Sequence, residues 1–468
     1  MRMVLQDAAL VTGAALVGGA PGAEADGVCI DSRRVRPGDL FVALPGAVTD
    51  GHLHVEDALA AGAAAALVAR PVAGHDGTTL APLLVVDEPA AALRALAGWV
   101  RDVTDPVVVG VTGSTGKTST KDLIAAVAAV TFRTVAAERS YNNELGVPLT
   151  LLQATQETDV VICELGARGP GQIRELCEYV RPRIGVVTTV GVTHYEQFGS
   201  VEAIVAAKSE LPAALPEGGV AVLNADDPRV AAMAEVTRAD VVTYGIGAGA
   251  WLRAESVELD ELGRPSFTMA RGADRRRVTL GSSGRHQVGN ALAAGAVGLV
   301  LGLSLDQVAA GLAAARMSPW RMQVEKRAGV VVVNDAYNAN PTSMAAALET
   351  CAAMVQPGGR LLAVLGYMAE LGDIEEAEHE RVGALAAAGV QRLVVVGERA
   401  RPIAQGAAAA GLAEVVVVDA GAGPAAAVEA LGELRPGDVV LVKASRVAGL
   451  ERAASFVARP PVREAMQP

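Results

Sequence analysis

The sequence has little cysteine, and what it has is scattered. Four of its 468 residues are Cys (Cys29, Cys163, Cys177 and Cys351), with no CxxC pair and no histidine-rich segment beside them. A structural zinc site needs thiolates or imidazoles at short spacing, so the sequence offers none. Scattered single cysteines suit a reducing compartment. We therefore expect a cytoplasmic protein.

Positive charge is also in short supply. Lys and Arg number 40 against 52 Asp and Glu, which gives a formal net charge of -12. Proteins that bind nucleic acid broadly do so by neutralising phosphates with Lys and Arg. This balance excludes a nucleic-acid partner of that kind, but leaves room for a local basic pocket.

Two apolar segments raise the question of a membrane. The first 25 residues combine Arg2, an apolar stretch and a small-residue site, as a secretory signal does, but Asp7 interrupts the stretch. The run 286–305 is uncharged and about as long as a membrane span. Its Gln287, Asn290 and many Ala and Gly favour a buried helix instead. We expect no stable membrane insertion.

The chain is too long for one hydrophobic core, and its pattern predicts three domains: 1–104, 105–316 and 317–468. The first reads as a small α/β unit with strands in GDLFVAL, AAAALVAR and PLLVVDE and a helix over 90–100. Asp105-Pro106 marks its end, because the residue before proline avoids helical geometry.

The two remaining segments alternate apolar strands with helices. The central one contains VVVGVT, TDVVICELGA, IGVVTTV and GGVAVLN, with helices from about Thr118 and over 172–180. The third contains GVVVVND, RLLAVLG, QRLVVVGE, AEVVVVDA and DVVLVKAS. Such alternation predicts parallel sheets covered on both faces, with ligands beyond the carboxyl ends of the strands. The expected fold class is α/β: a small N-terminal α/β domain, a central parallel-sheet domain and a C-terminal Rossmann-like domain.

A glycine loop lies between a strand and a helix in PVVVGVTGSTGKTSTK. Its small residues let backbone N–H groups converge on phosphates, while Lys117 adds a cation and the Thr118 hydroxyl can ligate magnesium. Val111 stands where the usual P-loop has glycine. The loop predicts ATP binding through Gly113, Ser114, Thr115, Gly116, Lys117, Thr118 and Ser119. An ordinary glycine turn is the alternative, and a nucleotide loop alone does not identify the reaction.

Two further side chains stand at strand ends in the central segment. Glu164 ends DVVICE and His194 follows IGVVTTV, so both project toward the phosphate loop. Either alone reads as a solvated or satisfied polar group, but together beside a phosphate loop they favour Mg²⁺. Lys208 in EAIVAAKSEL reads from the sequence alone as a surface lysine.

Eight motifs together resemble the Mur ligase family over essentially the whole chain. They are DSRRVRPGDLFVALPG with DGH (31–52), TGSTGKT, SYNNELGVPLTLL (140–152), HQVGNALAA, SPWRM, NDAYNANPTSM and the pair LGYMAELG (365–372) and KASR (443–446). The resemblance implies an ATP-dependent amide ligase of peptidoglycan precursor synthesis, acting through an acyl phosphate. LGYMAELG and KASR favour the branch that uses D-alanyl-D-alanine and a UDP-N-acetylmuramoyl-tripeptide, although KASR departs from the more usual Lys-Gly-Ser-Arg. A monomer is expected.

The resemblance also implies roles for individual residues. Lys117, Glu164, His194 and Lys208 are the expected catalytic set; two Mg²⁺ ions would be held by Thr118, Glu164, His194 and a carbamylated Lys208. Nucleotide contacts are expected from Asn290, Arg321 and Asp335, although Gln287 stands where asparagine is usual and Trp320 where glycine is usual. The expected substrate contacts are Ser32, Arg33, Gly46, Asn142, Asn143, Arg168, Asn338, Asn340, Ser445 and Arg446.

Two kinds of alternative stay open at this point. One is another Mur-type ligase, either diaminopimelate- or lysine-adding or of the folylpolyglutamate synthase type. The DSR and GDLFVAL segments oppose the folylpolyglutamate type, and the Asp-Asn-Pro-Arg motif of the diaminopimelate-adding enzyme is absent. The other is a nucleotide-dependent regulatory protein. Such a protein needs only the loop and leaves the motifs around Asn290, Arg321 and Asp335 unexplained.

Overall fold

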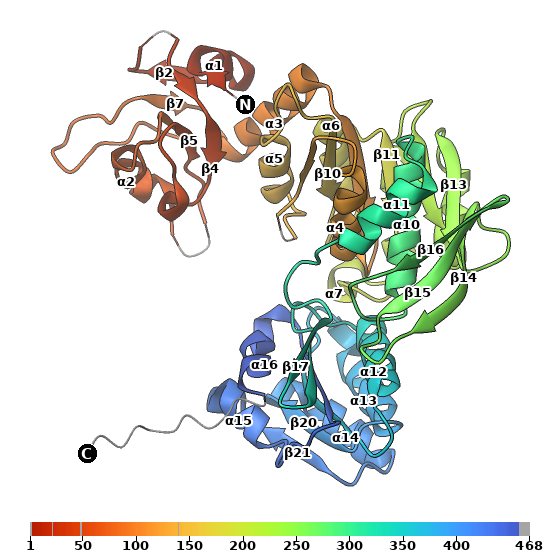
Figure 1. Ribbon diagram of the computed structural model, residues 1–468. Helices are drawn as coiled ribbons and strands as arrows, with labels where there is room; N and C mark the ends of the chain where they lie inside the picture. The colour runs from red at the N-terminus through yellow and green to blue at the C-terminus, as the bar shows by residue number, and fades with distance from the viewer. Residues whose placement is uncertain (1, 21, 47–48, 139, 458–468) are drawn as a thin grey trace, which may run out of the picture.

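The computed structural model describes residues 2–20, 22–46, 49–138 and 140–457. The chain folds into an N-terminal, a central and a C-terminal body, coloured red to orange, orange to green and blue in Figure 1. The predicted start of the first domain at residue 1 and the predicted end of the third domain at residue 468 lie outside the described residues.

The N-terminal body is a sheet in the order β2-β7-β6-β5-β4 beside the antiparallel pair β1-β3. Helix α3 (Pro89–Thr104) leads out of it. Its residues Leu93, Leu96 and Val100 are buried on one face, which packs against α1 and α5. The other elements are β1 (Met3–Val4), α1 (Leu5–Thr12), β2 (Ala15–Val17), β3 (Glu24–Ala25), β4 (Gly27–Cys29), β5 (Asp39–Val42), α2 (Val55–Ala60), β6 (Ala65–Val68) and β7 (Leu83–Val85).

The central sheet has the order β16-β15-β14-β13-β12-β11-β8-β10-β9 among the described residues. Strands β8, β10, β11 and β12 pair in parallel as predicted. Strands β9, β13 and β14, which were not predicted, join this sheet in parallel. Strands β15 and β16 extend it beyond β14 through antiparallel pairs, also without being predicted. The strands are β8 (Val107–Thr112), β9 (Thr134–Ala136), β10 (Val160–Glu164), β11 (Ile184–Val187), β12 (Val220–Asn224), β13 (Asp240–Gly245), β14 (Leu252–Leu259), β15 (Pro265–Arg271) and β16 (Asp274–Thr279).

Helices cover both faces of the central sheet. One hydrophobic cluster joins one face to α4 (Lys117–Ala128), α10 (Gln287–Val300) and α11 (Leu305–Ala314). A second joins the other face to α3, α5 (Gly146–Leu151), α6 (Gln172–Val180) and α8 (Val201–Ala213). The short helices are α7 (Tyr195–Phe198) and α9 (Pro228–Ala231). The uncharged run 286–305 is thus mainly the buried helix α10, and no helix of the described residues is long and apolar enough to cross a membrane.

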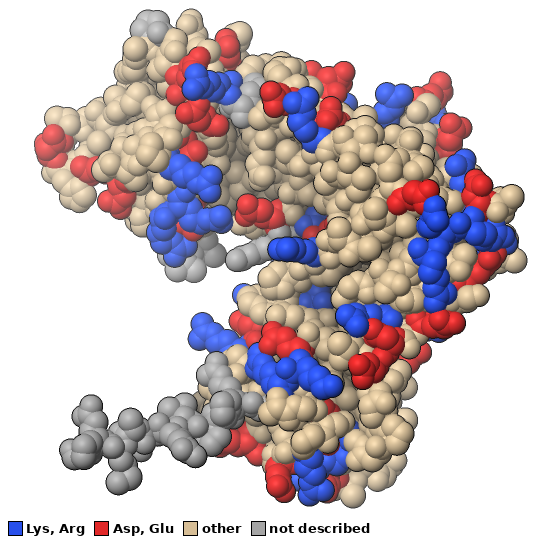
Figure 2. Space-filling view, in the orientation of Figure 1, with Lys and Arg blue, Asp and Glu red and all other residues tan. Residues whose placement is uncertain are grey.

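The C-terminal sheet has the order β17-β18-β22-β19-β20-β21, with β17 antiparallel to β18 and the other pairs parallel. The strands are β17 (Gln323–Arg327), β18 (Val330–Asn334), β19 (Leu361–Gly366), β20 (Arg392–Val396), β21 (Val415–Val418) and β22 (Val439–Lys443). The helices are α12 (Pro341–Met354), α13 (Glu375–Ala387), α14 (Arg401–Ala409), α15 (Gly423–Glu429) and α16 (Ala453–Phe456). A hollow opens on one side between this body and the N-terminal body, while this body remains in contact with the central one (Figure 2).

Candidate active site

A cavity of about 1470 Å³ lies where the segments after β8, β10 and β11 meet those after β18, β19 and β22. Strand carboxyl ends of two sheets therefore face one space, as expected for ligand sites of parallel sheets. The predicted residues that line it are Ser114, Thr115, Gly116, Lys117, Thr118, Ser119, Asn142, Asn143, Glu164, Arg168, His194, Asn290, Arg321, Asp335, Asn338, Asn340, Ser445 and Arg446.

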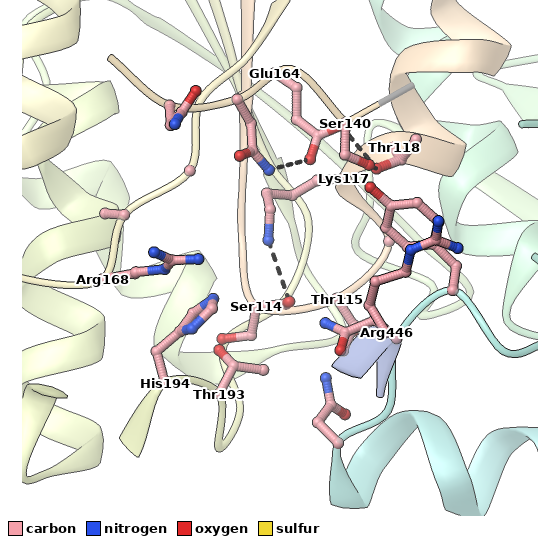
Figure 3. Close-up of a pocket in the computed structure, with 18 of the residues that line it drawn as sticks. Ser114, Thr115, Lys117, Thr118, Ser140, Glu164, Arg168, Thr193, His194 and Arg446 are labelled. Atoms are coloured by element: carbon pink, nitrogen blue, oxygen red, sulfur yellow. Dashed lines mark hydrogen bonds between the residues drawn. The ribbon is translucent and has the colours of Figure 1, made fainter. Parts of the chain in front are cut away.

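The glycine loop runs from the end of β8 into the first turn of α4. Gly116 has φ 82°, and a Cβ there would lie 2.6 Å from Oδ1 of Asn290. Gly113 has φ 142°, and a Cβ there would overlap the Thr188 hydroxyl. Both positions therefore require glycine. Lys117 points back into the loop, with Nζ donating to the Gly113 carbonyl at 2.7 Å and the Ser114 carbonyl at 3.3 Å (Figure 3). Burial lowers the pKa of Lys117.

Glu164 lies at the end of β10 and is buried, so its alternative reading as a solvated group is wrong. The Thr118 hydroxyl donates to its Oε2 at 2.7 Å, and the Asn142 amide donates to its Oε1 at 2.8 Å. Ser140 Oγ lies 2.8 Å from Thr118 Oγ1. Sequence reasoning missed Ser140, although it opens the SYNNELG segment. Four oxygen-bearing side chains thus meet at the start of α4.

Lys208 lies in the middle of α8 with 1% of its surface exposed, so the alternative of a surface lysine is wrong. Its ammonium lies 5.8 Å from the centre of the Phe198 ring. Burial, with a smaller contribution from the charge of Lys117, lowers the pKa of Lys208 to about 7. At neutral pH the Lys208 amine is therefore unprotonated in a large fraction of the molecules. Lys208 and Gly113 are not among the residues that line the cavity.

His194 follows β11 and has φ 52°, a left-handed backbone conformation. The carboxylate of Glu370 from the C-terminal body meets its Nδ1. The Arg168 guanidinium lies 3.6 Å from the same carboxylate, and Figure 3 shows the Arg168 and His194 side chains extending into the cavity. The contact with His194 lowers the pKa of Glu370. The sequence analysis identified the LGYMAELG segment as a motif but did not single out Glu370 within it.

Asn290 on α10 lies against the glycine loop. Its Oδ1 accepts from Thr120 Oγ1 at 3.2 Å, and its Nδ2 donates to Gln287 Oε1 at 2.9 Å. The glutamine that stands in place of asparagine therefore fixes the orientation of the Asn290 amide.

The SPWRM segment crosses from the C-terminal body to the loop. The Arg321 guanidinium stacks on the Tyr337 ring at 4.1 Å. Trp320 has φ 60°, which favours glycine, yet its indole lies 4.5 Å below the Arg446 guanidinium. This contact gives a physical reason for tryptophan at that position.

Asp335, which follows β18, is paired with two other groups of the protein. Its Oδ2 lies 2.5 Å from Nζ of Lys443, which is buried, and its Oδ1 accepts the Met322 N–H at 2.9 Å. Two other predicted contacts also have structural partners: Asn340 caps the N-terminus of α12, and Ser445 Oγ accepts the Ala369 N–H at 2.9 Å.

The three predicted contacts of the N-terminal body do not line the cavity. Ser32 and Arg33 lie in a 3₁₀ turn capped by Asp31, which also pairs with the Arg33 side chain at 2.8 Å. Gly46 lies in the exposed loop after β5. Arg34, in the same 3₁₀ turn as Ser32 and Arg33, contacts the central body: its Nη1 lies 3.4 Å from the Tyr141 hydroxyl.

Comparisons with known proteins match all three bodies. Residues 24–98 match the model "Mur ligase family, catalytic domain", residues 111–298 the "Mur ligase middle domain" and residues 320–446 the "Mur ligase, glutamate ligase domain". A UDP-N-acetylmuramoyl-tripeptide–D-alanyl-D-alanine ligase of Mycobacterium tuberculosis is 47% identical over 458 residues, covering 90% of this chain and 89% of the relative.

Two solved structures extend the similarity to the whole fold. MurF from Acinetobacter baumannii superimposes with a TM-score of 0.86 at 28% identity, covering 98% of this chain and 99% of the other. MurF from Thermotoga maritima, in complex with ADP, superimposes with a TM-score of 0.79 at 29% identity, covering 92% and 97%.

Proposed function

The chain belongs to the Mur ligase family, and on that premise we propose that it uses ATP to join D-alanyl-D-alanine to UDP-N-acetylmuramoyl-tripeptide. The observation that carries this proposal is the 47% identity, over nine-tenths of both chains, to a relative named for that reaction. The diaminopimelate-adding, lysine-adding, folylpolyglutamate and regulatory readings have no comparable support.

In the proposed reaction, an oxygen of the tripeptide carboxylate attacks the γ-phosphorus of ATP, and ADP leaves. The amine nitrogen of D-alanyl-D-alanine then attacks the acyl carbon, phosphate leaves and the nitrogen loses a proton. The chain would contribute positioning and positive charge. Lys117 would turn from the loop carbonyls to the phosphates, and Arg321 would add a second cation from the C-terminal body.

The oxygen set at the start of α4 fits a magnesium ion. Thr118 and Glu164 offer hard oxygen ligands, and the Arg321 Nη2 already lies 2.7 Å from Thr118 Oγ1, so the position accommodates positive charge. We propose a second ion at His194 and a carbamylated Lys208. Within the described residues no three His, Cys, Asp or Glu side chains form a metal-binding group. Nucleotide phosphates, water and the Lys208 carbamate would therefore supply the remaining ligands. Bound magnesium supplies electrophilic stabilisation of phosphate charge.

The burial of Lys208 supports the proposed carbamylation. The unprotonated amine adds to CO₂, forming an N–C bond and releasing a proton, so the side chain becomes anionic. A pKa near 7 makes that amine available at neutral pH. A negative group would then replace the buried ammonium, and it would interact favourably with the charge of Lys117.

The assignment of the substrates to the three bodies is also part of the proposal. Residues 1–104 would bind the UDP end through Ser32, Arg33 and Gly46, and residues 105–316 would bind ATP. Residues 317–468 would close on the nucleotide and bind the amine substrate. The remaining contacts would come from the cavity residues Asn142, Asn143, Arg168, Asn338, Asn340, Ser445 and Arg446. We propose a cytoplasmic monomer.

An amine screen with mass spectrometry tests this function. The protein is incubated with ATP, UDP-N-acetylmuramoyl-tripeptide and, separately, D-alanyl-D-alanine, diaminopimelate or lysine. We expect a product of the pentapeptide mass with D-alanyl-D-alanine, and multiple turnovers of ATP to ADP only when carboxylate and amine are both present. A product with diaminopimelate or lysine instead, or ADP release that needs neither substrate, contradicts the proposal.

A further inference from the structure

A contact between two bodies converges on His194. The loop 367–372, which follows β19 in the C-terminal body, lies against the turn 194–198 of the central body. The Glu196 N–H donates to the Glu370 carbonyl at 3.2 Å. A Cβ on Gly372, which has φ 58°, would lie 3.1 Å from Cα of Glu196, so glycine permits the close approach. Backbone contacts thus fix the loop beside His194.

The loop is also held from behind. The Met368 N–H donates to Nε2 of the buried His379 at 2.9 Å, and the Ala369 N–H donates to Ser445 Oγ at 2.9 Å. The Tyr367 ring stacks on the His379 ring at 5.5 Å and lies 3.9 Å from the Arg399 guanidinium. Such bracing maintains Glu370 at φ 63°, a conformation that a glutamate rarely adopts unless its surroundings impose it.

The two residues of this contact, His194 and Glu370, both have left-handed backbone conformations. His194, at φ 52°, presents Nδ1 to the Glu370 carboxylate. Arg168 lies on the other carboxylate oxygen. A carboxylate beside Nδ1 favours a proton on that nitrogen, so Nε2 carries the lone pair. His194 lines the cavity.

We infer that Glu370 is a positioning residue for His194: docking of the C-terminal body sets the orientation and tautomer of the ring from which Nε2 binds a divalent cation. The inference rests on the proposed role of His194 as a metal ligand. A carboxylate on the second ring nitrogen is how proteins orient metal-binding imidazoles. Here the carboxylate belongs to a different body, so metal binding is coupled to closure.

The test compares Glu370→Ala with Glu196→Gln, whose exposed side chain lies in the same contact. Histidine is labelled with ¹⁵N in the full chain with ADP; the chain has six histidines, and His194→Ala identifies the His194 signals. Wild type and Glu196→Gln are expected to show a proton on Nδ1 of His194, and Glu370→Ala a shift toward the other tautomer. Mn²⁺ affinity, measured by electron paramagnetic resonance with ADP, is expected to fall roughly 10- to 100-fold in Glu370→Ala.

The outcomes separate this inference from the proposed function. Unchanged His194 signals and Mn²⁺ affinity in Glu370→Ala, with weakened Mn²⁺ binding in His194→Ala, overturn the inference alone. Wild-type Mn²⁺ affinity in His194→Ala removes the metal role and the inference with it. If Glu370→Ala does not fold, Glu370→Gln, which keeps the volume and loses the charge, is measured instead. It is expected to weaken Mn²⁺ binding, and wild-type behaviour of that variant overturns the inference.

Discussion

Arg321 of the C-terminal body donates from Nη2 to the Thr118 hydroxyl of the phosphate loop at 2.7 Å. The two residues are separated by 203 positions in the chain. Arg321 also donates to Ser140 at 2.9 Å, so one cation from the third body lies among the oxygens proposed to hold magnesium. The C-terminal body therefore contacts the nucleotide loop directly.

Lys117→Ala should reduce product formation and phosphate release by at least ~100-fold, because the loop loses the cation proposed to stabilise the transferring phosphoryl group. A coupled phosphate assay measures the effect. Lys326→Ala, an exposed lysine of β17, is the matched control and should retain wild-type turnover. Near-normal turnover of Lys117→Ala would refute the assignment of the loop.

Lys208→Ala should lose activity by roughly 100-fold, and added formate or acetate should restore part of it, because a free carboxylate can occupy the place of the carbamate. The same salts should leave Lys326→Ala and Lys117→Ala unchanged. The measurement is turnover against carboxylate concentration at constant ionic strength. Rescue of all three variants alike would be a salt effect and would contradict the carbamate.

Stability should depend on pH through Lys208. Its pKa of about 7 in the folded chain lies below the usual value of about 10.4, so between these values the unfolded chain binds a proton that the folded chain does not. Stability from this group therefore rises as pH increases through that window. In CO₂-free buffer, Lys208→Met should be more stable than wild type at pH 7 by on the order of 2 kcal/mol.

The difference should shrink as pH approaches 10. Chemical denaturation at pH 7, 8.5 and 10 measures it, with Lys326→Met as the control for loss of an exposed lysine. A constant difference across the three pH values would argue against a buried, depressed lysine.

Asp335→Asn should destabilise the protein by roughly 3 kcal/mol, because it leaves the buried ammonium of Lys443 without its carboxylate. The sequence alone predicts a different result, a raised KM for ATP at unchanged stability, since the motif implies a nucleotide-facing aspartate. Thermal unfolding with ATP kinetics separates the two. The double variant Asp335→Asn/Lys443→Met should recover much of the stability. No change in Tm for Asp335→Asn would show that the ion pair is not structural.

The parts of the fold that the sequence predicted depend on local pattern. The apolar runs at β8, β10 and β11 and the glycine loop before α4 are visible in the sequence because a buried parallel strand needs apolar residues on both faces. Strand β16, with the sequence DRRRVT, is mostly exposed and carries three arginines, so its pattern resembles a solvated loop. Its pairing with β15 depends on tertiary contacts that the pattern does not contain.

The site shows the same division. Glu164 was identifiable because it ends an apolar strand, His194 because it follows one, and Lys117 because of its loop; β11 itself ends at Val187. The burial of Lys208 depends on how α8 packs against Phe198 and the central sheet, and a lysine at helical spacing carries no sign of it. Glu370 acts from another body across 176 positions of sequence, so only the fold brings it to His194.

The most direct test of the ligase reaction uses UDP-N-acetylmuramoyl-tripeptide with both oxygens of its reacting carboxylate replaced by ¹⁸O. With ATP and D-alanyl-D-alanine, mass spectrometry should find one ¹⁸O in the released phosphate and one in the new amide. That result follows from transfer of the γ-phosphoryl group to the carboxylate before the amine attacks. Unlabelled phosphate, or phosphate release without an amide product, would contradict the account.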